Sequence, residues 1–252
     1  MSSLVLGSFV FAGLSASAML AMRVRMSLPA HHLSSATQDT MKLAMGLVAT
    51  MTALVLGLLV SSTKATYDTE KVEITQMAAK IIYLDRVLGS YGPESAEARA
   101  TLRQGAESAI KRIWPEGESQ QASLASFSAN SSEALRDAIQ KLAPQTDTQR
   151  AAKGQAVAVA ADLGQMSWLL FEQLDSSISV TMLVVVVCWL AILFFSFGLF
   201  APANGTALGS LLVAAISVSG AIFLIMELDQ PFQGFIQISS KPMYTALAHL
   251  GR

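Results

Sequence analysis

Long apolar runs separated by polar sequence dominate the chain. Four segments have about 20 mostly apolar residues, the length of a helix that crosses a hydrocarbon core of roughly 30 Å. They cover residues 3–22, 43–62, 178–200 and 208–228. The first has no Lys or Arg before it and is longer than the core of a signal peptide, so we predict that it is a span and is not cleaved. The pattern predicts an all-α integral membrane protein with four transmembrane helices.

The second apolar segment continues into charged sequence without a break in its periodicity. Beyond Lys64 the apolar positions alternate three and four residues apart, which defines a heptad seam. The same phase fits the apolar segment, so we predict one helix from about residue 36 to residue 89, ended by the glycines and proline of "GSYGPE". Two helices with a bend near residues 61–66 are the alternative. The seam residues are Ile74, Met77, Ile81, Leu84, Leu88 and Tyr91.

The region between the second and third spans carries most of the charged residues, with both signs mixed. Its patterns predict helices over 98–114 and 132–142, a polar loop over 116–132, and a helix from about residue 147 that runs directly into the third span. A short amphipathic helix is expected near residue 241. The predicted domains are therefore 1–62, 63–177, 178–228 and 229–252.

Composition narrows the classes of function. Hydrophobic residues make up 52% of the chain and charged residues 14%, well below the roughly 25% charged residues of soluble domains. A net charge of −1 gives no indication of a nucleic-acid partner. Because Cys188 is the only cysteine, an intrachain disulfide is impossible. We predict that membrane lipid surrounds the protein.

Catalytic motifs are absent from the sequence. There is no nucleophile elbow, Gly-rich phosphate loop or metal-ligand spacing, so we predict no enzyme activity, catalytic residue, metal or cofactor. The adjacent His31 and His32 cannot share a helix face, and we interpret them as an interfacial or simply solvated pair rather than a metal site. The uncharged, unbroken spans also argue against alternating-access transport.

Two adjacent stripes on the second span suggest a channel. In a ring of subunits, small residues let helices approach closely. Bulky apolar residues form a hydrophobic constriction, which gates by dewetting. The alternative is ordinary packing within one subunit. The small stripe is Gly46, Thr50, Ala53, Gly57 and Ser61, and the bulky stripe is Leu47, Met51, Leu54 and Leu58.

Long motifs then suggest a family. "MGLVATMTALVLGLLVSS", "TQMAAKIIYLDRVLGSYGPE", "FFSFGLFAPANGTA" and "GAIFLIMELDQPFQGFIQISSKP" resemble the bacterial bestrophin-like family, four-span proteins distantly related to bestrophin channels. "ALVLGLLV" is similar to the bestrophin neck segment, which places Leu54 and Leu58 at the neck positions and Thr50 one turn before them. "DQPFQG" is similar to the segment that follows the fourth bestrophin span. The post-span motif comprises Glu227, Asp229, Pro231 and Phe232.

The resemblance implies a homo-oligomer, a pentamer by analogy, that passes small inorganic ions. It implies a bacterial inner-membrane location with both termini and the soluble region in the cytoplasm. The bestrophin neck aromatics are replaced here by leucines and a threonine, and the calcium-binding acidic run has no counterpart, so calcium gating is not expected. The resemblance gives no ion selectivity.

We therefore predict an ion channel with a hydrophobic neck formed by the second span and a heptad seam that helps to assemble the ring. The competing hypothesis is a non-conducting oligomeric scaffold whose helical extension binds partners. The predicted pore-lining residues are Thr50, Met51, Leu54, Gly57, Leu58 and Ser61.

Overall fold

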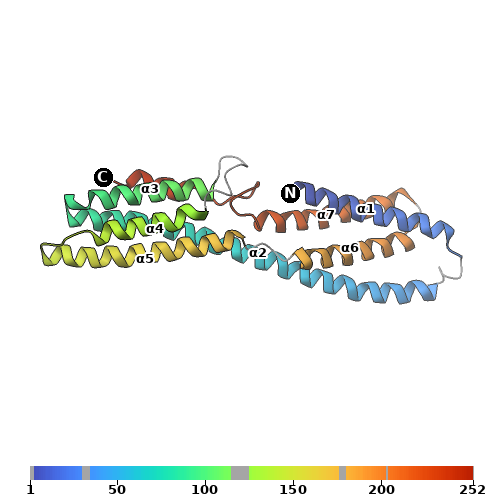
Figure 1. Cartoon of the computed structure of the whole chain (residues 1–252). Coiled ribbons are helices and arrows are strands. Elements are labelled where there is room, and N and C mark those ends of the chain that lie inside the picture. Colours follow the sequence, from blue (N-terminus) through green and yellow to red (C-terminus); the bar gives the residue numbers. More distant parts are fainter. Residues whose placement is uncertain (1–2, 30–34, 115–124, 176–179, 203, 252) are drawn as a thin grey trace. The chain divides into compact units, whose positions relative to one another are not determined.

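The structure is a computed structural model that describes residues 3–29, 35–114, 125–175, 180–202 and 204–251. Among these residues it is all-helical, as predicted (Figure 1). Four described helices are long and apolar enough to cross a membrane, which confirms the predicted spans. His31 and His32 lie outside the described residues. The elements are α1 (Ser3–Ser27), α2 (Ser35–Tyr91), the 3-10 helix η2 (Pro93–Ser95), α3 (Ala96–Ile113), α4 (Ala125–Gln140), α5 (Asp147–Asp175), α6 (Val180–Phe200), α7 (Gly205–Leu228) and α8 (Lys241–His249).

Helix α2 is one continuous helix of 57 residues. The prediction of a single helix is confirmed, because no proline interrupts the sequence from residue 35 to residue 91. The helix ends where Gly92 takes a φ of 123° and Pro93 opens η2. The Ser95 hydroxyl lies 2.6 Å from the Leu88 carbonyl oxygen and 2.7 Å from that of Gly92, which fixes the turn.

The chain divides into two compact units, each described here by itself. The membrane unit comprises Met1–Tyr67 and Ser177–Ile236, and the helical extension comprises Asp68–Ser176 and Gln237–Arg252. Helix α2 contributes residues to both.

Helices α1 and α6 of the membrane unit approach each other at Gly198. A Cβ on Gly198 would overlap the Ala18 carbonyl oxygen and lie 3.0 Å from the Ala18 Cα. The Ser17 hydroxyl, on the residue before Ala18, donates a hydrogen bond of 2.9 Å to the carbonyl oxygen of Ala191, which lies seven residues before Gly198 on α6. Small residues at this crossing let the two backbones meet, which is how helices gain packing energy in lipid.

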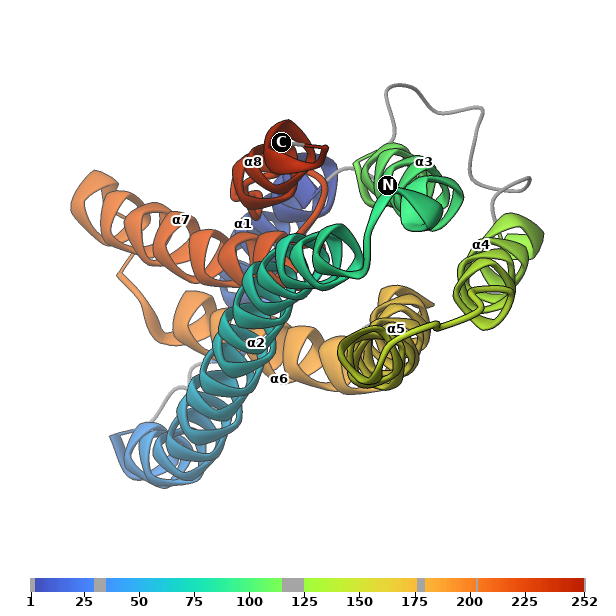
Figure 2. The ribbon, with the colours of Figure 1, turned by 90° about the vertical axis from the view of Figure 1, so that its left-hand side faces the viewer.

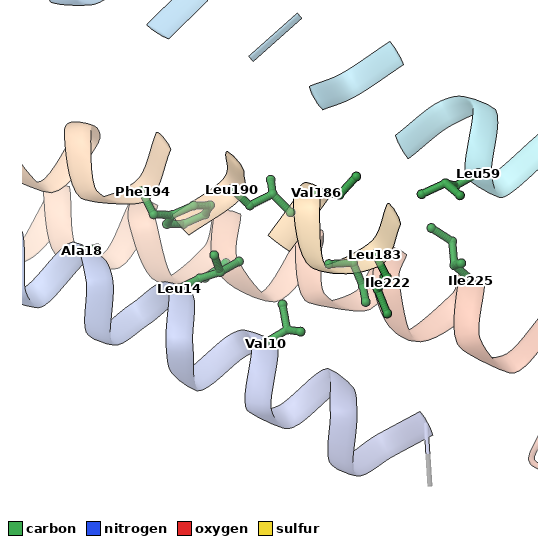
Figure 3. Packing of buried hydrophobic residues seen from close by; sticks show 11 residues of the cluster. Val10, Leu14, Ala18, Leu59, Leu183, Val186, Leu190, Phe194, Ile222 and Ile225 are labelled. Carbon is green, nitrogen blue, oxygen red and sulfur yellow. The ribbon is translucent and has the colours of Figure 1, made fainter. Parts of the chain in front are cut away.

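An apolar cluster holds the membrane unit together. Figure 3 shows Leu14 of α1 beside Leu190 and Phe194 of α6, and Ile222 of α7 beside Leu183 of α6. Leu14 is 1% exposed and Ile222 is fully buried. Helix α2 reaches this cluster through Leu59 and the half-buried residues around it. Most of the α2 span lies outside the core: 11% of its apolar window is buried, against 33% in α1.

The heptad seam of α2 is buried within one subunit. Its residues are at most 4% exposed, from Ile74 through Tyr91. Helix α2 is joined to α5 by Lys80 and Asp162, whose charged atoms are 2.9 Å apart, and to α3 by Asp85 and Arg99. The prediction that the seam assembles the ring is therefore wrong: intrasubunit packing already uses this surface.

Helix α4 packs against α3 and α5 within the extension (Figure 2). It begins at Ala125, so the predicted loop is wrong over residues 125–131. That stretch has no glycine or proline to end a helix. Helix α5 ends at Asp175 and α6 begins at Val180, while the connection predicted to be helical lies outside the described residues.

The predicted short C-terminal helix is confirmed as α8, which packs on α3. Met243 is fully buried and Leu250 is 6% exposed. The Trp114 indole N–H also donates to the Ile238 carbonyl oxygen at 2.9 Å, which holds the segment before α8. The C-terminal segment is thus an integral part of the extension.

Candidate functional site

The membrane part of α2 presents an exposed apolar face, here called the open face. It consists of the predicted pore-lining residues with Leu47 added, and each of them is exposed in the single chain. Leu54 is 74% exposed and Leu58 is 63% exposed. A Cβ on Gly57 would meet no atom within 4 Å. The open face comprises Leu47, Thr50, Met51, Leu54, Gly57, Leu58 and Ser61.

The opposite face of α2 packs on the rest of the membrane unit. Thr52 is 3% exposed, Leu59 is 6% exposed and Thr63 is 5% exposed. The Thr52 hydroxyl donates to the Val48 carbonyl oxygen at 2.7 Å, and the Thr63 hydroxyl donates to that of Leu59 at the same distance. These bonds satisfy hydroxyls that would otherwise be costly in an apolar setting. The buried face therefore fixes which residues the open face presents.

Charged residues flank the α2 span but do not enter it. The sequence has no charged residue from 43 to 63. Before the span, the Lys42 ammonium lies 3.2 Å from an Asp39 carboxylate oxygen. After it, the Lys64 ammonium lies 5.2 Å from the centre of the Tyr67 ring, within the range of a cation–π interaction. Only uncharged side chains are available along the open face.

The post-span motif forms a turn around the Glu227 carboxylate. Glu227, at the end of α7, is 2% exposed. Its Oε2 accepts hydrogen bonds from the backbone N–H of Phe235 at 2.7 Å and of Ile236 at 3.2 Å. Gly234 adopts a φ of 88°, which a side chain would strain. A Cβ there would lie 2.5 Å from the same carboxylate oxygen.

The other predicted residues of this motif surround the turn. Pro231 and Phe232 are buried, and Asp229 is half-buried at the C-terminus of α7. A buried carboxylate that accepts two amides is a stable internal anchor. Glu227 therefore shapes the segment that leaves the membrane unit, and the described residues give no group of three or more His, Cys, Asp or Glu that could hold a metal.

A second buried carboxylate, Asp85 of α2, was not predicted. Its two oxygens accept from the Arg99 guanidinium at 2.8 and 2.9 Å, and Oδ2 also accepts from the Gly251 backbone N–H at 3.2 Å. Burial opposes ionisation, but the hydrogen bonds from Arg99 and Gly251 and the positive charge of Arg99 outweigh it, so the pKa of Asp85 is lowered. The sequence did contain one signal for this site: Asp85 is an acidic residue directly beside the apolar seam of α2.

These observations define a class of protein: a four-span, all-α membrane protein whose second span carries an exposed apolar face and continues as a helix into an extension. The bestrophin-like domain model matches residues 12–243. The chain therefore belongs to the bestrophin-like family, as the sequence motifs suggested.

Solved structures share the fold. A crystal structure of a bacterial bestrophin homologue from Klebsiella pneumoniae with a point mutation has a TM-score of 0.62 and 12% identity, covering 97% of this chain and 98% of that one. A crystal structure described only as a mutated membrane protein has a TM-score of 0.64 and 12% identity, covering 96% of both chains. No curated protein matches the chain.

Proposed function

We propose that the protein is an oligomeric ion channel in which the open face of α2 lines an axial pathway. The observation that carries this proposal is the exposure of that face in a single subunit: Leu47, Met51, Leu54 and Leu58 are 49–74% exposed. Lipid alone can cover such a face. Membership of the bestrophin-like family is what favours a ring of α2 helices over lipid as the cover.

The neck of this pathway is formed by Leu54 and Leu58, which are four residues apart and one above the other on the helix. Rings of leucine repel water when the opening is narrow, so ions face a dewetting barrier there. Exposed Gly57 projects roughly 60° to one side of Leu54 on the helix, where it leaves room for a neighbouring helix. Met51 and Thr50 line the next turn, and Ser61 lies beyond the neck.

The assembly that we propose is a homo-oligomer, with five subunits by analogy with bestrophins. It lies in a bacterial inner membrane, surrounded by lipid, with both termini and the helical extension in the cytoplasm. Small inorganic ions are the permeating species. Because the heptad seam is buried inside each subunit, contacts between subunits use other surfaces.

The test is an ion-flux assay on purified protein in vesicles. Leu54→Ala and Leu58→Ala each remove apolar volume from the neck, so we expect both to raise basal flux above the wild-type level. Leu20→Ala is the matched control, because Leu20 is 55% exposed and belongs to α1, whereas the open face belongs to α2.

The subunit number is measured on the same samples by native mass spectrometry. If the oligomer is well folded and the basal flux of the neck variants and of Leu20→Ala equals that of wild type, the proposal that Leu54 and Leu58 form a neck is contradicted. An oligomer that passes no ions in any form supports the scaffold hypothesis instead.

A further inference from the structure

The turn that follows α7, residues 229–236 and here called the post-span turn, carries an aromatic side chain that the membrane unit leaves uncovered. Of its two phenylalanines, Phe232 is 7% exposed and Phe235 is 74% exposed. The backbone at Phe235 is held in place, because its N–H donates to the buried Glu227 carboxylate at 2.7 Å and Gly234 before it adopts a φ of 88°. The turn therefore presents an exposed apolar ring from a fixed position.

The ring of Phe235 lies beside the membrane-crossing part of α7. Its centre is 6.5 Å from the centre of the Phe223 ring. Phe223 precedes Leu228, the last residue of α7, by roughly 7.5 Å along the helix axis, and its side chain leans further toward the helix start. A ring within 6.5 Å of Phe223 is therefore level with α7 and does not extend past its end.

The neighbouring surface of α7 is apolar and exposed. Val213, Ile216 and Leu224 are 38–64% exposed, on a helix that is apolar enough to cross a membrane. Phe223 is half-buried and directly precedes Leu224, so it borders this surface. The Phe235 ring continues the exposed apolar surface of the span to its end.

The segment that carries the ring contains no charge. Residues 230–240 include no Asp, Glu, Lys or Arg. The polar side chain beside the ring is an amide, that of exposed Gln233, and an amide can both donate and accept hydrogen bonds. Aromatic rings gather at the level of lipid headgroups, where one side of the surroundings is apolar and the other is wet. An uncharged turn with one exposed ring matches this zone.

We propose that the post-span turn is an anchor that binds the phospholipid surface at the boundary of the membrane. The Phe235 ring inserts beside the upper acyl chains, and the Gln233 amide faces the headgroups. The anchor does not depend on the proposed channel function. Because the chain enters the helical extension at Gln237, the anchor fixes to the bilayer the segment that connects α7 to the extension.

The test uses a nitroxide spin label on Phe235→Cys in the full chain, reconstituted in phosphatidylcholine vesicles. Cys188 is exposed and is first replaced by serine. Two collision rates of the label are measured, one with oxygen, which concentrates among acyl chains, and one with a water-soluble nickel chelate. Val213→Cys is the reference within the α7 span. Gln104→Cys is the matched control, because Gln104 is exposed on α3 in the extension.

We expect the ratio of oxygen to nickel collision rates at Phe235→Cys to be several-fold higher than at Gln104→Cys and to approach that at Val213→Cys. A second variant, Phe235→Trp, keeps an aromatic ring at the site. Its fluorescence in excess of the three native tryptophans should be quenched by lipids that carry bromine high in the acyl chains.

A ratio at Phe235→Cys equal to that at Gln104→Cys would place the ring in water and overturn the anchor. A label shielded from both reagents, with spin–spin broadening that disappears on dilution with unlabelled chains, would show a second copy as the occupant and also overturn it. So would additional fluorescence of Phe235→Trp that brominated lipid leaves unquenched. Each of these outcomes leaves the proposed channel untouched.

Discussion

The Gly198→Ala variant tests the packing of α1 against α6. The added methyl would overlap the Ala18 carbonyl oxygen and lie 3.0 Å from both the Ala18 carbonyl carbon and Cα. These are backbone atoms, so rotation of a side chain cannot relieve the contact. The two helices must separate, which also strains the 2.9 Å hydrogen bond from Ser17 to Ala191.

The cost follows from two opposing terms. Overpacking a tight contact costs about 1–3 kcal/mol, and a clash with backbone belongs at the upper end of that range. Alanine is favoured over glycine inside a helix by about 1 kcal/mol, which offsets part of the cost. We therefore expect a net loss of about 2 kcal/mol in the free energy of unfolding.

Unfolding by denaturant titration in detergent measures this difference. Gly13→Ala on α1 is the matched control, because a Cβ on Gly13 would meet no atom within 4 Å. The control should be as stable as wild type or slightly more so. Equal stability of Gly198→Ala and Gly13→Ala would refute the close approach of α1 and α6.

Two further substitutions test the buried carboxylates. Gly234→Ala should lower the unfolding free energy by about 2–3 kcal/mol, because the positive φ is strained and the methyl displaces Glu227 from its amides; the same titration measures it. Asp85→Asn should cost about 2 kcal/mol at neutral pH by weakening the bonds to Arg99. Because the pKa of Asp85 is lowered in the folded state, its contribution is present above the ordinary pKa of an aspartate and is lost as the pH falls through the lowered value. Acid titration of Asp85→Asn should therefore lack part of the wild-type loss of stability.

Exposed neighbours provide the controls for these two variants. Gln233→Ala removes an exposed side chain beside Gly234 and should change stability by less than about 0.5 kcal/mol. Asp162→Asn breaks an ion pair with Lys80 in which the Asp162 side chain is 60% exposed, so we expect a cost below about 1 kcal/mol. Controls as unstable as the test variants would contradict the roles of Gly234 and Asp85.

Apolar periodicity and helix-ending glycine and proline residues predicted the parts of the fold that local sequence determines. The phase shared by both halves of α2, and the Gly92–Pro93 stop, predicted a single helix that the structure confirms. The burial of the seam within the subunit depends on tertiary packing, so the sequence alone could not distinguish it from a contact between subunits. The prediction of where α4 begins was wrong for a different reason. The serines and the asparagine suggested a loop, but residues 125–131 contain no glycine or proline that would end a helix.

The candidate site was predictable in its residues and not in its contacts. Alternation of small and bulky residues identified Leu54 and Leu58, but only packing separates exposed Thr50 from buried Thr52. The role of Glu227 depends on amides eight and nine residues later in a turn that requires Gly234. No periodic pattern encodes such a turn.

The most direct measurement of the central claim is thiol modification at the neck during current recording. Cys188 is exposed and is replaced by serine first, so that Leu58→Cys supplies the only thiol. If α2 lines the pathway, a charged, membrane-impermeant thiol reagent will change the current through Leu58→Cys and leave Leu20→Cys unaffected. A fully labelled Leu58→Cys protein with unaltered current, or equal responses at both positions, would contradict the account.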